Sequence, residues 1–363
     1  MTTLDALLYL WRHRPGNEIP ALVQDVWAHQ WTKGNRPLIV KQKRLSPGKW
    51  WLMLSLPPGM TYAELHKTTE AIMDATFGVV ELERTGRRIS LTVTTEQLKS
   101  LYPFAWEYDG KMALPVHLGH SAVGEIIKDL ATAPHLLVAG QTGGGKSNLL
   151  HVIAMCLLLS REVDLRIIDL KVLEFDYLGK YAKLATDQDE AMAVLDGLNA
   201  ELDRRLAILK KARVVKIQNF RGHMPYVVLI IDELAELRDK KAQEKLNRLL
   251  RLSRAAGMSV VCATQRPSST IFNNFGDSKA LFPARVCFQV DDGVNSRMVL
   301  DNDRAAYLPE IPGRCIVQWG RELEAQTMLL PPDDPAIVEP LLAKTKRSDT
   351  EDDDKHGLVL PPR

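Results

Sequence analysis

The chain has 363 residues, of which 45% are hydrophobic and 25% are charged. This length allows about two domains with cores of their own, and the composition is typical of globular proteins rather than of disordered or collagen-like chains. Lysine and arginine number 47 and the acidic residues 45, so the net charge of +2 alone does not indicate a partner.

The chain also lacks the usual signals for membranes and secretion. It contains no run of eighteen apolar residues, so we expect no membrane span. Residues 1–6 do not form a basic segment followed by an apolar one, so we expect no signal peptide and a cytoplasmic location. The cysteines are far apart and fit no metal-binding spacing, so we predict four buried, reduced thiols: Cys156, Cys262, Cys287 and Cys315.

The sequence of the N-terminal third predicts a helical segment followed by a small domain. Residues 1–36 form a helical segment with helices at 3–12 and 19–33. Residues 37–98 form a small α/β domain, in which Thr61 is the expected N-cap and Glu64 completes a capping box. Its predicted elements are strands at 37–44 and 49–56, a helix at 61–76, and a hairpin of 79–83 with 88–94.

An aromatic- and proline-rich connector at 99–117 leads to the larger part of the chain, 118–344. There, strands and helices alternate, which indicates a mainly parallel sheet with helices on both faces. The predicted elements are 135–139, 149–160, 164–169, 188–213, 226–231, 240–256, 258–263, 284–290 and 314–319.

The last residues, 345–363, are predicted to be a disordered acidic tail that either keeps the protein in solution or masks a basic surface. Five acids lie between Asp349 and Asp354, so the rest of the chain is more basic than the net charge indicates. That balance suits contact with a polyanion.

A phosphate-binding loop follows the predicted strand 135–139 and precedes an apolar helix. Its glycines let several backbone N–H groups face the phosphates, next to the positive end of the helix. Lys146 is expected to neutralise the β- and γ-phosphates, and the Ser147 hydroxyl to hold Mg²⁺. The sequence therefore predicts a nucleoside triphosphate site formed by Gly140, Gln141, Thr142, Gly143, Gly144, Gly145, Lys146 and Ser147.

A second acidic element lies at the end of the buried strand 226–231. Asp232 is placed to orient the Mg²⁺ shell, and Glu233 to polarise an attacking water. The alternative is an acidic start to a helix over 234–237. Because the phosphate loop is present, we favour hydrolysis.

Several segments stand in order with these two elements: 133–140, 168–171, 253–257, 263–267 and 295–301. Together they resemble the motor of FtsK/SpoIIIE-type DNA translocases, which are P-loop ATPases of the HerA-FtsK group. Residues 37–94 resemble, more weakly, the small domain that precedes this motor, notably at Pro58-Gly59-Met60. Residues 1–36 match nothing in the family.

The resemblance implies a RecA-like α/β fold with a mainly parallel sheet, preceded by a small α+β domain. It also implies a homo-oligomeric ring, usually a hexamer, around DNA, with ATP and Mg²⁺ bound between subunits. Asp169 and Lys171 match the family's Asp-Pro-Lys element, although Leu170 replaces the proline. Both an interface role and a local salt bridge remain open for this pair.

Two further catalytic residues follow from the resemblance. Gln265 ends a buried strand, where it can bond the γ-phosphate or the water beside Glu233; the alternative is a polar strand end that faces solvent. Arg254 matches the arginine finger that acts on a neighbouring subunit, because a permanently charged guanidinium suits transition-state phosphate charge. Arg285 is the rival for this role, and many helix arginines such as Arg248 and Arg251 are simply solvated or paired.

DNA contacts are expected on loops that face the central channel. By resemblance these carry Arg266, the stretch through Lys279, and Arg297, which would bind phosphates irrespective of sequence. Asp291 and Asp292 stand where the family usually has a basic residue, which weakens this attraction. Lys279 is alternatively an ordinary exposed lysine.

The function predicted from the sequence is an ATP-driven translocase of DNA, with double-stranded DNA as the expected substrate. Cell-division members of the family carry N-terminal membrane spans and a C-terminal winged helix, and neither pattern occurs here. We therefore expect transfer or segregation of plasmid, phage or integrative-element DNA, with a membrane-recruiting or conjugation partner. The alternatives are a protein-secretion or conjugative coupling ATPase with the same core, and an assembly protein that binds ATP without hydrolysing it.

Overall fold

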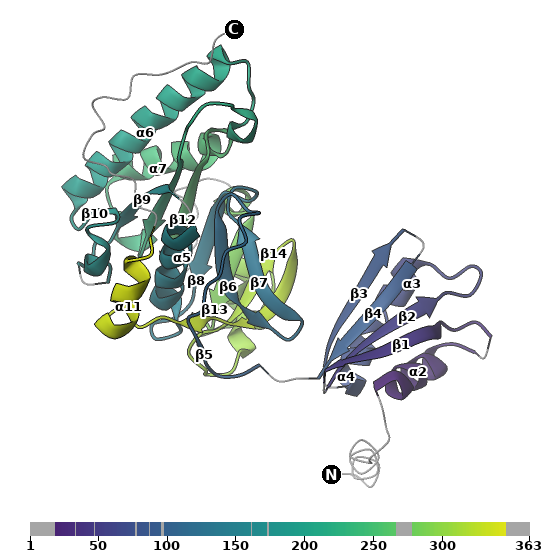
Figure 1. The fold of residues 1–363 in the computed structure, drawn as a ribbon. Coiled ribbons are helices and arrows are strands. Elements are labelled where there is room, and N and C mark those ends of the chain that lie inside the picture. Colours follow the sequence, from purple (N-terminus) through teal and green to yellow (C-terminus); the bar gives the residue numbers. More distant parts are fainter. Residues whose placement is uncertain are drawn as a thin grey trace. The chain divides into compact units, whose positions relative to one another are not determined.

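The computed structural model describes residues 19–345 apart from positions 33, 47, 77, 87, 96, 97, 161, 173 and 266–277. The expected helix at 3–12 and the expected acidic tail beyond residue 345 lie outside these residues. The chain divides into two compact units (Figure 1). The first comprises Met1–Leu98 with Ala122–Gly124, and the second comprises Lys99–Ser121 with Glu125–Arg363.

The first unit contains a four-stranded antiparallel sheet and three described helices (Figure 1). The strand order is β1-β2-β4-β3. The strands are β1 (Leu38–Ser46), β2 (Lys49–Ser55), β3 (Val79–Thr85) and β4 (Arg88–Thr94), and the helices are α2 (Ile19–Gln30), α3 (Tyr62–His66) and α4 (Thr69–Thr76). Residues Thr85 and Arg88 pair at the end of β3 and β4, which confirms the predicted hairpin.

One face of this sheet and one face of α2 form the core of the first unit. Alternate residues of β2 are buried (Trp50, Leu52 and Leu54), as expected for a sheet with one covered face. Trp27 of α2 is fully buried in the same cluster, and its indole N–H donates to Thr68 Oγ1 at 3.2 Å. Helix α2, which belongs to the helical segment expected at 1–36, therefore packs against the sheet of this unit.

The predicted helix at 61–76 is divided into α3 and α4. The capping box at its start is confirmed, because Thr61 and Glu64 each bond the other's backbone N–H. The Thr68 and Thr69 hydroxyls donate to the carbonyls of Leu65 and His66, both at 2.8 Å. Such bonds compete with continued helical pairing, which explains the break.

The second unit is built on a ten-stranded sheet in the order β10-β9-β11-β12-β8-β13-β14-β15-β6-β7. The pairs from β10 to β13 are parallel, whereas β14 and β15 are antiparallel additions. This confirms the mainly parallel α/β fold. The strands are β6 (Pro115–Ser121), β7 (Gly124–Asp129), β8 (His135–Ala139), β9 (Val163–Ile168), β10 (Lys183–Ala185), β11 (Tyr226–Ile231), β12 (Met258–Thr264), β13 (Ala284–Phe288), β14 (Arg314–Trp319) and β15 (Arg321–Gln326).

The expected connector at 99–117 is part of this second unit. It contributes β5 (Tyr102–Pro103), which pairs with β16 (Met328–Leu329), and the first residues of β6. Strand β6 is almost wholly buried and pairs with β15. Short strands with mixed composition gave no periodic signal in the sequence, which is why β5, β6, β7, β10, β15 and β16 were not predicted.

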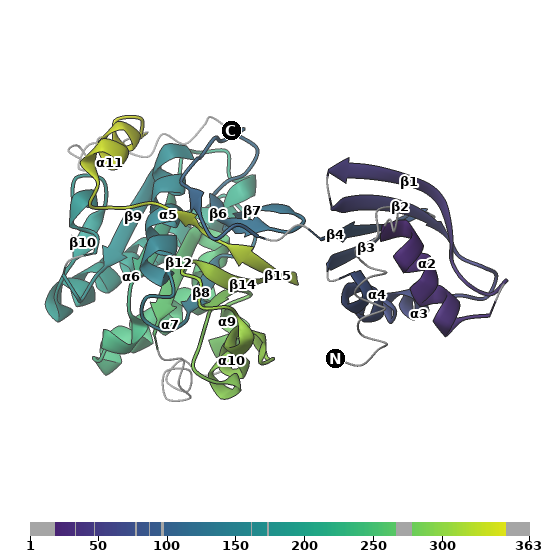
Figure 2. The ribbon, with the colours of Figure 1, turned by 90° about the horizontal axis from the view of Figure 1, so that it is seen from below.

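Helices cover both faces of the large sheet (Figures 1 and 2). Alternate residues of β8 point to opposite faces: Leu136 and Val138 belong to the core beneath α5 and α11, and Leu137 and Ala139 to the core beneath α6 and α7. The helices are α5 (Lys146–Ser160), α6 (Gln188–Lys211), α7 (Lys240–Leu252), α9 (Ser278–Leu281), α10 (Gly293–Leu300) and α11 (Pro335–Leu342). The central strands are therefore buried on both sides.

Two expectations from composition can be checked directly. All four cysteines are buried and free, as predicted. Among the described helices, none combines the length and the hydropathy that a bilayer crossing requires.

Trp27→Ala is expected to destabilise the first unit by about 3–5 kcal/mol, because it leaves a large cavity under α2 and removes the hydrogen bond that the Thr68 hydroxyl accepts. Urea unfolding followed by circular dichroism measures this loss. Val40→Ala is the matched control, because Val40 is 57% exposed on β1 and its removal creates no cavity. An unchanged unfolding curve for Trp27→Ala would show that α2 is not part of the cooperative core.

Candidate active site

The phosphate loop joins β8 to α5 at the carboxyl edge of the parallel strands. Gly140 and Gly145 have φ values of +146° and +114°, which side-chain-bearing residues rarely adopt. A Cβ at Gly140 would lie 2.6 Å from the Cβ of Phe288, at the end of β13. Glycine is therefore required both by the backbone conformation and by the close approach of Phe288.

Hydrogen bonds fix this loop to the neighbouring strand ends. The backbone N–H of Gln141 donates to the Gln289 carbonyl at 3.0 Å, and the two side-chain amides bond each other at 3.0 Å. The N–H of Gly313 donates to the Gly144 carbonyl at 2.8 Å. Bonds within the protein thus hold the loop in shape.

Lys146, the first residue of α5, is only 6% exposed. Its ammonium donates to the Gln141 carbonyl at 2.8 Å, inside the loop. Burial lowers the pKa of Lys146 to about 8, although the nearby Glu233 carboxylate opposes this shift. A second negative group at this position, such as a phosphate, would restore the charged form.

Asp232 and Glu233 follow β11, as the sequence predicts, and are 3% and 7% exposed. Burial raises the pKa of Asp232, while the charge of Lys171 lowers it. Glu233 caps only a single 3-10 turn, Leu234–Glu236, with a long bond of 3.4 Å to the Ala235 N–H. The expected alternative role as the start of a helix is therefore minor, since α7 begins six residues later at its own cap, Asp239.

Gln265 connects the two nucleotide elements. Its backbone N–H donates to the Glu233 carboxylate at 3.1 Å, and its side-chain Oε1 accepts from the Thr142 hydroxyl at 2.9 Å. The side chain therefore contacts the phosphate loop, at a position that is itself exposed. This contact joins the ends of β11 and β12 to the loop that follows β8.

The Asp169–Lys171 pair lies beside the same acids. The Asp169 carboxylate is fully buried and accepts backbone N–H groups of its own loop. Lys171 Nζ lies 3.3 Å from Asp232 Oδ2 and 3.8 Å from Glu233 Oε2. Of the two roles left open by the sequence, the structure shows the local salt bridge.

Comparison with known proteins agrees with this arrangement. The profile of the FtsK/SpoIIIE family matches residues 103–225, which include the phosphate loop. Residues 103–225 therefore match an FtsK/SpoIIIE family domain. This confirms the resemblance identified in the sequence.

Two relatives of this FtsK/SpoIIIE domain are both described as the DNA translocase FtsK. The chain is 36% identical over 225 residues to the protein of Chlorobaculum tepidum, covering 55% of this chain and 28% of that protein. It is 34% identical over 212 residues to the protein of Treponema pallidum, covering 53% and 26%. The chain thus spans about a quarter of the length of these relatives.

Solved structures confirm the fold of the FtsK/SpoIIIE domain. The conjugation coupling protein TcpA of pCW3, in its monomer form with ATPγS, has a TM-score of 0.64 at 23% identity, over 90% of this chain and 99% of that one. The cytoplasmic domain of the type VII secretion ATPase EccC from Thermomonospora curvata has a TM-score of 0.55 at 20% identity, over 74% and 34%.

The two arginines considered for the finger role differ in what they contact. Arg285 is only 13% exposed and bonds the carbonyls of Phe282 and Val299, the Gln318 side chain, and Asp301 at 2.9 Å. Arg254 is exposed on the 3-10 turn Ser253–Ala256 and donates to the Thr132 carbonyl at 3.3 Å. Arg285 is thus engaged within its own chain, whereas the Arg254 guanidinium lies at the surface.

The residues expected to bind DNA are only partly described. Arg266 and the side chain of Lys279 lie outside the described residues. Arg297 is on α10, is 55% exposed, and lies 4.0 Å from Asp303. Asp292 accepts the Asn295 N–H at 2.7 Å as the N-cap of α10, so this unexpected acid has a structural role.

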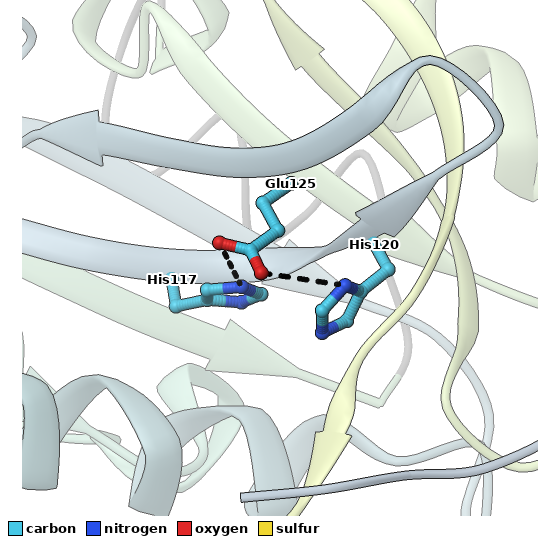
Figure 3. Close-up of side chains that lie close together, drawn as sticks. All are labelled: His117, His120 and Glu125. Carbon is cyan, nitrogen blue, oxygen red and sulfur yellow. Dashed lines mark ion pairs between the residues drawn. The ribbon is translucent and has the colours of Figure 1, made fainter. Parts of the chain in front are cut away.

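A separate cluster, His117, His120 and Glu125, lies between β6 and β7 (Figure 3), with potential ligand atoms within 4.8 Å of one another. The Gly119 N–H donates to His117 Nδ1 at 3.1 Å. Burial lowers the pKa of His117 to about 4, and because Nδ1 accepts this N–H, the neutral ring carries its proton on Nε2, which faces Glu125 at 3.9 Å. Because Nε2 has no lone pair to offer in this state, the cluster is a poor metal site.

Sequence reasoning missed Glu174 and His151, which lie next to Ser147. His151 Nε2 lies 3.5 Å from Glu174 Oε2, and bonding to His151 lowers the pKa of Glu174, with a smaller contribution from the Ser147 hydroxyl. The spacing of His151 four residues after Ser147 places both on one side of α5. That spacing was the available signal, but nothing in the sequence linked it to Glu174.

Replacing the two arginines should separate structural from functional roles. We expect Arg285→Ala to lower the stability of the second unit by about 2 kcal/mol, because it leaves buried carbonyls without a donor. Arg254→Ala should leave the unfolding midpoint unchanged. Differential scanning calorimetry of both variants measures this. Equal losses for both would contradict the assignment of Arg285 as the structural arginine.

Proposed function

We propose that this chain is an ATP-driven motor that moves DNA. The observation that carries the proposal is the joining of the phosphate loop to the acids after β11 through Gln265, within an FtsK/SpoIIIE domain. The curated relatives of that domain are described as DNA translocases. We assign ATP binding to the loop from Gly140 to Ser147.

The residues present fit a magnesium ion. Asp232 Oδ2 is buried and accepts no hydrogen bond from the described residues, and its nearest cation is Lys171. A hard carboxylate oxygen and the Ser147 hydroxyl are ligands that Mg²⁺ accepts. When bound with ATP, Mg²⁺ would neutralise phosphate charge between Ser147 and Asp232.

The chain's own groups then perform the remaining steps. Lys146 leaves the Gln141 carbonyl and bonds the β- and γ-phosphates. Glu233, held in place by the Gln265 N–H, accepts the proton of the attacking water. The Gln265 side chain, now bonded to Thr142, lies where it can contact the γ-phosphate or that water.

We further propose that the motor is a homo-oligomer, a hexameric ring, with ATP at each subunit interface. Arg254 supports this proposal, because it is exposed and its guanidinium has no anionic partner within hydrogen-bond distance among the described residues. An arginine supplied by a neighbour stabilises transition-state charge and ties hydrolysis to assembly. Arg285 does not suit this role, since its bonds lie within its own chain.

DNA is the cargo we propose, bound through its backbone inside the ring. Arg266, Lys279 and Arg297 are the proposed phosphate contacts, and Arg297 is exposed on α10. Such contacts are independent of sequence and weaken steeply with salt. Two parts of this proposal rest on the sequence alone. The first is that the DNA is double-stranded and belongs to a plasmid, phage or integrative element. The second is a partner that recruits the motor to a membrane or conjugation machine.

Glu233→Gln should lower ATP turnover by about 100-fold or more, because the general base is lost. ATP binding should persist, because the phosphate loop is intact. Wild-type turnover should rise when duplex DNA is added, and the rise should disappear at high salt. Lys146→Ala should lose both binding and turnover. Phosphate release and binding of a fluorescent ATP analogue measure these effects.

The same assays test the competing functions. Stimulation by a protein or peptide cargo, with no response to DNA, would indicate a secretion ATPase. Unchanged turnover in Glu233→Gln would sink the assignment of this residue and favour ATP as a structural ligand only. Arg254→Ala mixed with Glu233→Gln should recover some turnover if the arginine acts on a neighbouring subunit.

ATP affinity should depend on pH through Lys146. In the nucleotide-free protein its pKa is lowered to about 8, and bound phosphates raise it, so binding takes up a proton above that pH. The affinity should therefore be constant below pH 8 and fall by up to about tenfold per pH unit above it. Calorimetric titration with ATPγS measures this, and Lys146→Arg should remove the dependence because guanidinium stays charged. A flat wild-type profile would contradict the assignment.

A further inference from the structure

The loop that follows β9, Asp169–Phe175, reaches both halves of the nucleotide site. At one end of it, Lys171 pairs with Asp232 at 3.3 Å and with Glu233 at 3.8 Å. At the other, Glu174 pairs with His151 of α5 at 3.5 Å and also interacts with the Ser147 hydroxyl. One short segment thus contacts the metal-binding hydroxyl and the acids after β11.

Lys171 supplies the positive charge that the two buried acids need in the nucleotide-free state. Asp232 and Glu233 are almost fully buried, and an unpaired buried carboxylate is costly. Lys146 directs its ammonium to the Gln141 carbonyl instead. Lys171 is 35% exposed and reaches in from the edge, so its ammonium can leave without unpacking the core.

The loop is strained at Val172, and the Asp169 carboxylate anchors its backbone. Val172 has φ of +76°, which is unfavourable for a β-branched residue. The buried Asp169 carboxylate accepts the N–H groups of Lys171, Glu174 and Phe175 at 3.1, 3.0 and 3.3 Å. The anchor fixes the base of the loop, while the Val172 side chain is 52% exposed and unpacked.

We propose that the Lys171 ammonium and the metal compete for the same cationic position beside Asp232, so that Lys171 is displaced when metal and nucleotide bind together. A divalent cation at Asp232 would lie beside the Lys171 ammonium, and like charges at such a distance repel strongly. The lysine therefore keeps free metal out until phosphates add negative charge. When Lys171 is displaced, the strained loop can relax, so the conformation of the loop depends on whether metal and nucleotide are bound. This inference rests on the proposed nucleotide site but not on hydrolysis or DNA.

The test measures binding of Mn²⁺ alone to the full-length, nucleotide-free chain by electron paramagnetic resonance. Lys171→Met should bind Mn²⁺ at least about tenfold more tightly than wild type, because two buried carboxylates lose their cation. Lys180→Met is the matched control. It removes an exposed lysine that lies beyond the end of this loop, so it should bind Mn²⁺ as wild type does. Lys171→Arg keeps the positive charge beside Asp232, so it should bind Mn²⁺ as weakly as wild type does.

Two further measurements check where Mn²⁺ binds and whether the variant is folded. Adding Asp232→Asn to Lys171→Met should remove the gain, and Mn²⁺ should raise the melting temperature of Lys171→Met more than that of wild type. The proposal is overturned if Lys171→Met binds Mn²⁺ no better than wild type, or if the gain survives Asp232→Asn. Lys171→Arg decides the matter if the methionine variant does not fold, because tight Mn²⁺ binding by the arginine variant contradicts a charge effect.

A failure here is distinct from a failure of the proposed function. A chain that hydrolyses ATP in response to DNA but shows unchanged Mn²⁺ binding in Lys171→Met loses only this inference. A chain with the expected Mn²⁺ gain but no ATP binding loses the proposed function instead.

Discussion

The second unit depends on gathering charged groups at an edge of a sheet that is otherwise buried on both faces. Parallel strands place their carboxyl ends together, so the loop after β8, the acids after β11 and the residue after β12 meet there. Almost no water reaches Asp232 or Glu233, so each needs a protein partner. The contacts of Lys171 and Gln265 meet that need, and they also make the site a connected unit.

The elements that the sequence predicted well are those with local signals. The phosphate loop, the strand before Asp232, the capping box at Thr61 and the alternation of strands with helices each depend on neighbouring residues. Such signals survive folding because the apolar core reinforces them. The FtsK/SpoIIIE resemblance rested on these local segments and was confirmed for the same reason.

The features that were missed depend on contacts between distant parts of the chain. Helix α2 joins the first unit because Trp27 meets Thr68, and no periodicity relates those positions. Arg285 looked like a rival finger until the carbonyl of Val299 and the side chain of Gln318 were seen around it. The role of Lys171 stayed open for the same reason, since its partners come from another strand end. Spacing along a chain shows which residues share a face, but not what covers that face.

The bond between the Thr142 hydroxyl and the Gln265 side chain has a mechanical consequence. A phosphate oxygen that enters the loop competes as an acceptor for that hydroxyl, so Gln265 Oε1 would lose its donor and the side chain would be free to donate through Nε2 instead. The next residue along the chain is Arg266, the first of the proposed DNA contacts. A change of bonding at the phosphates would therefore be one peptide link away from the residue proposed to bind DNA.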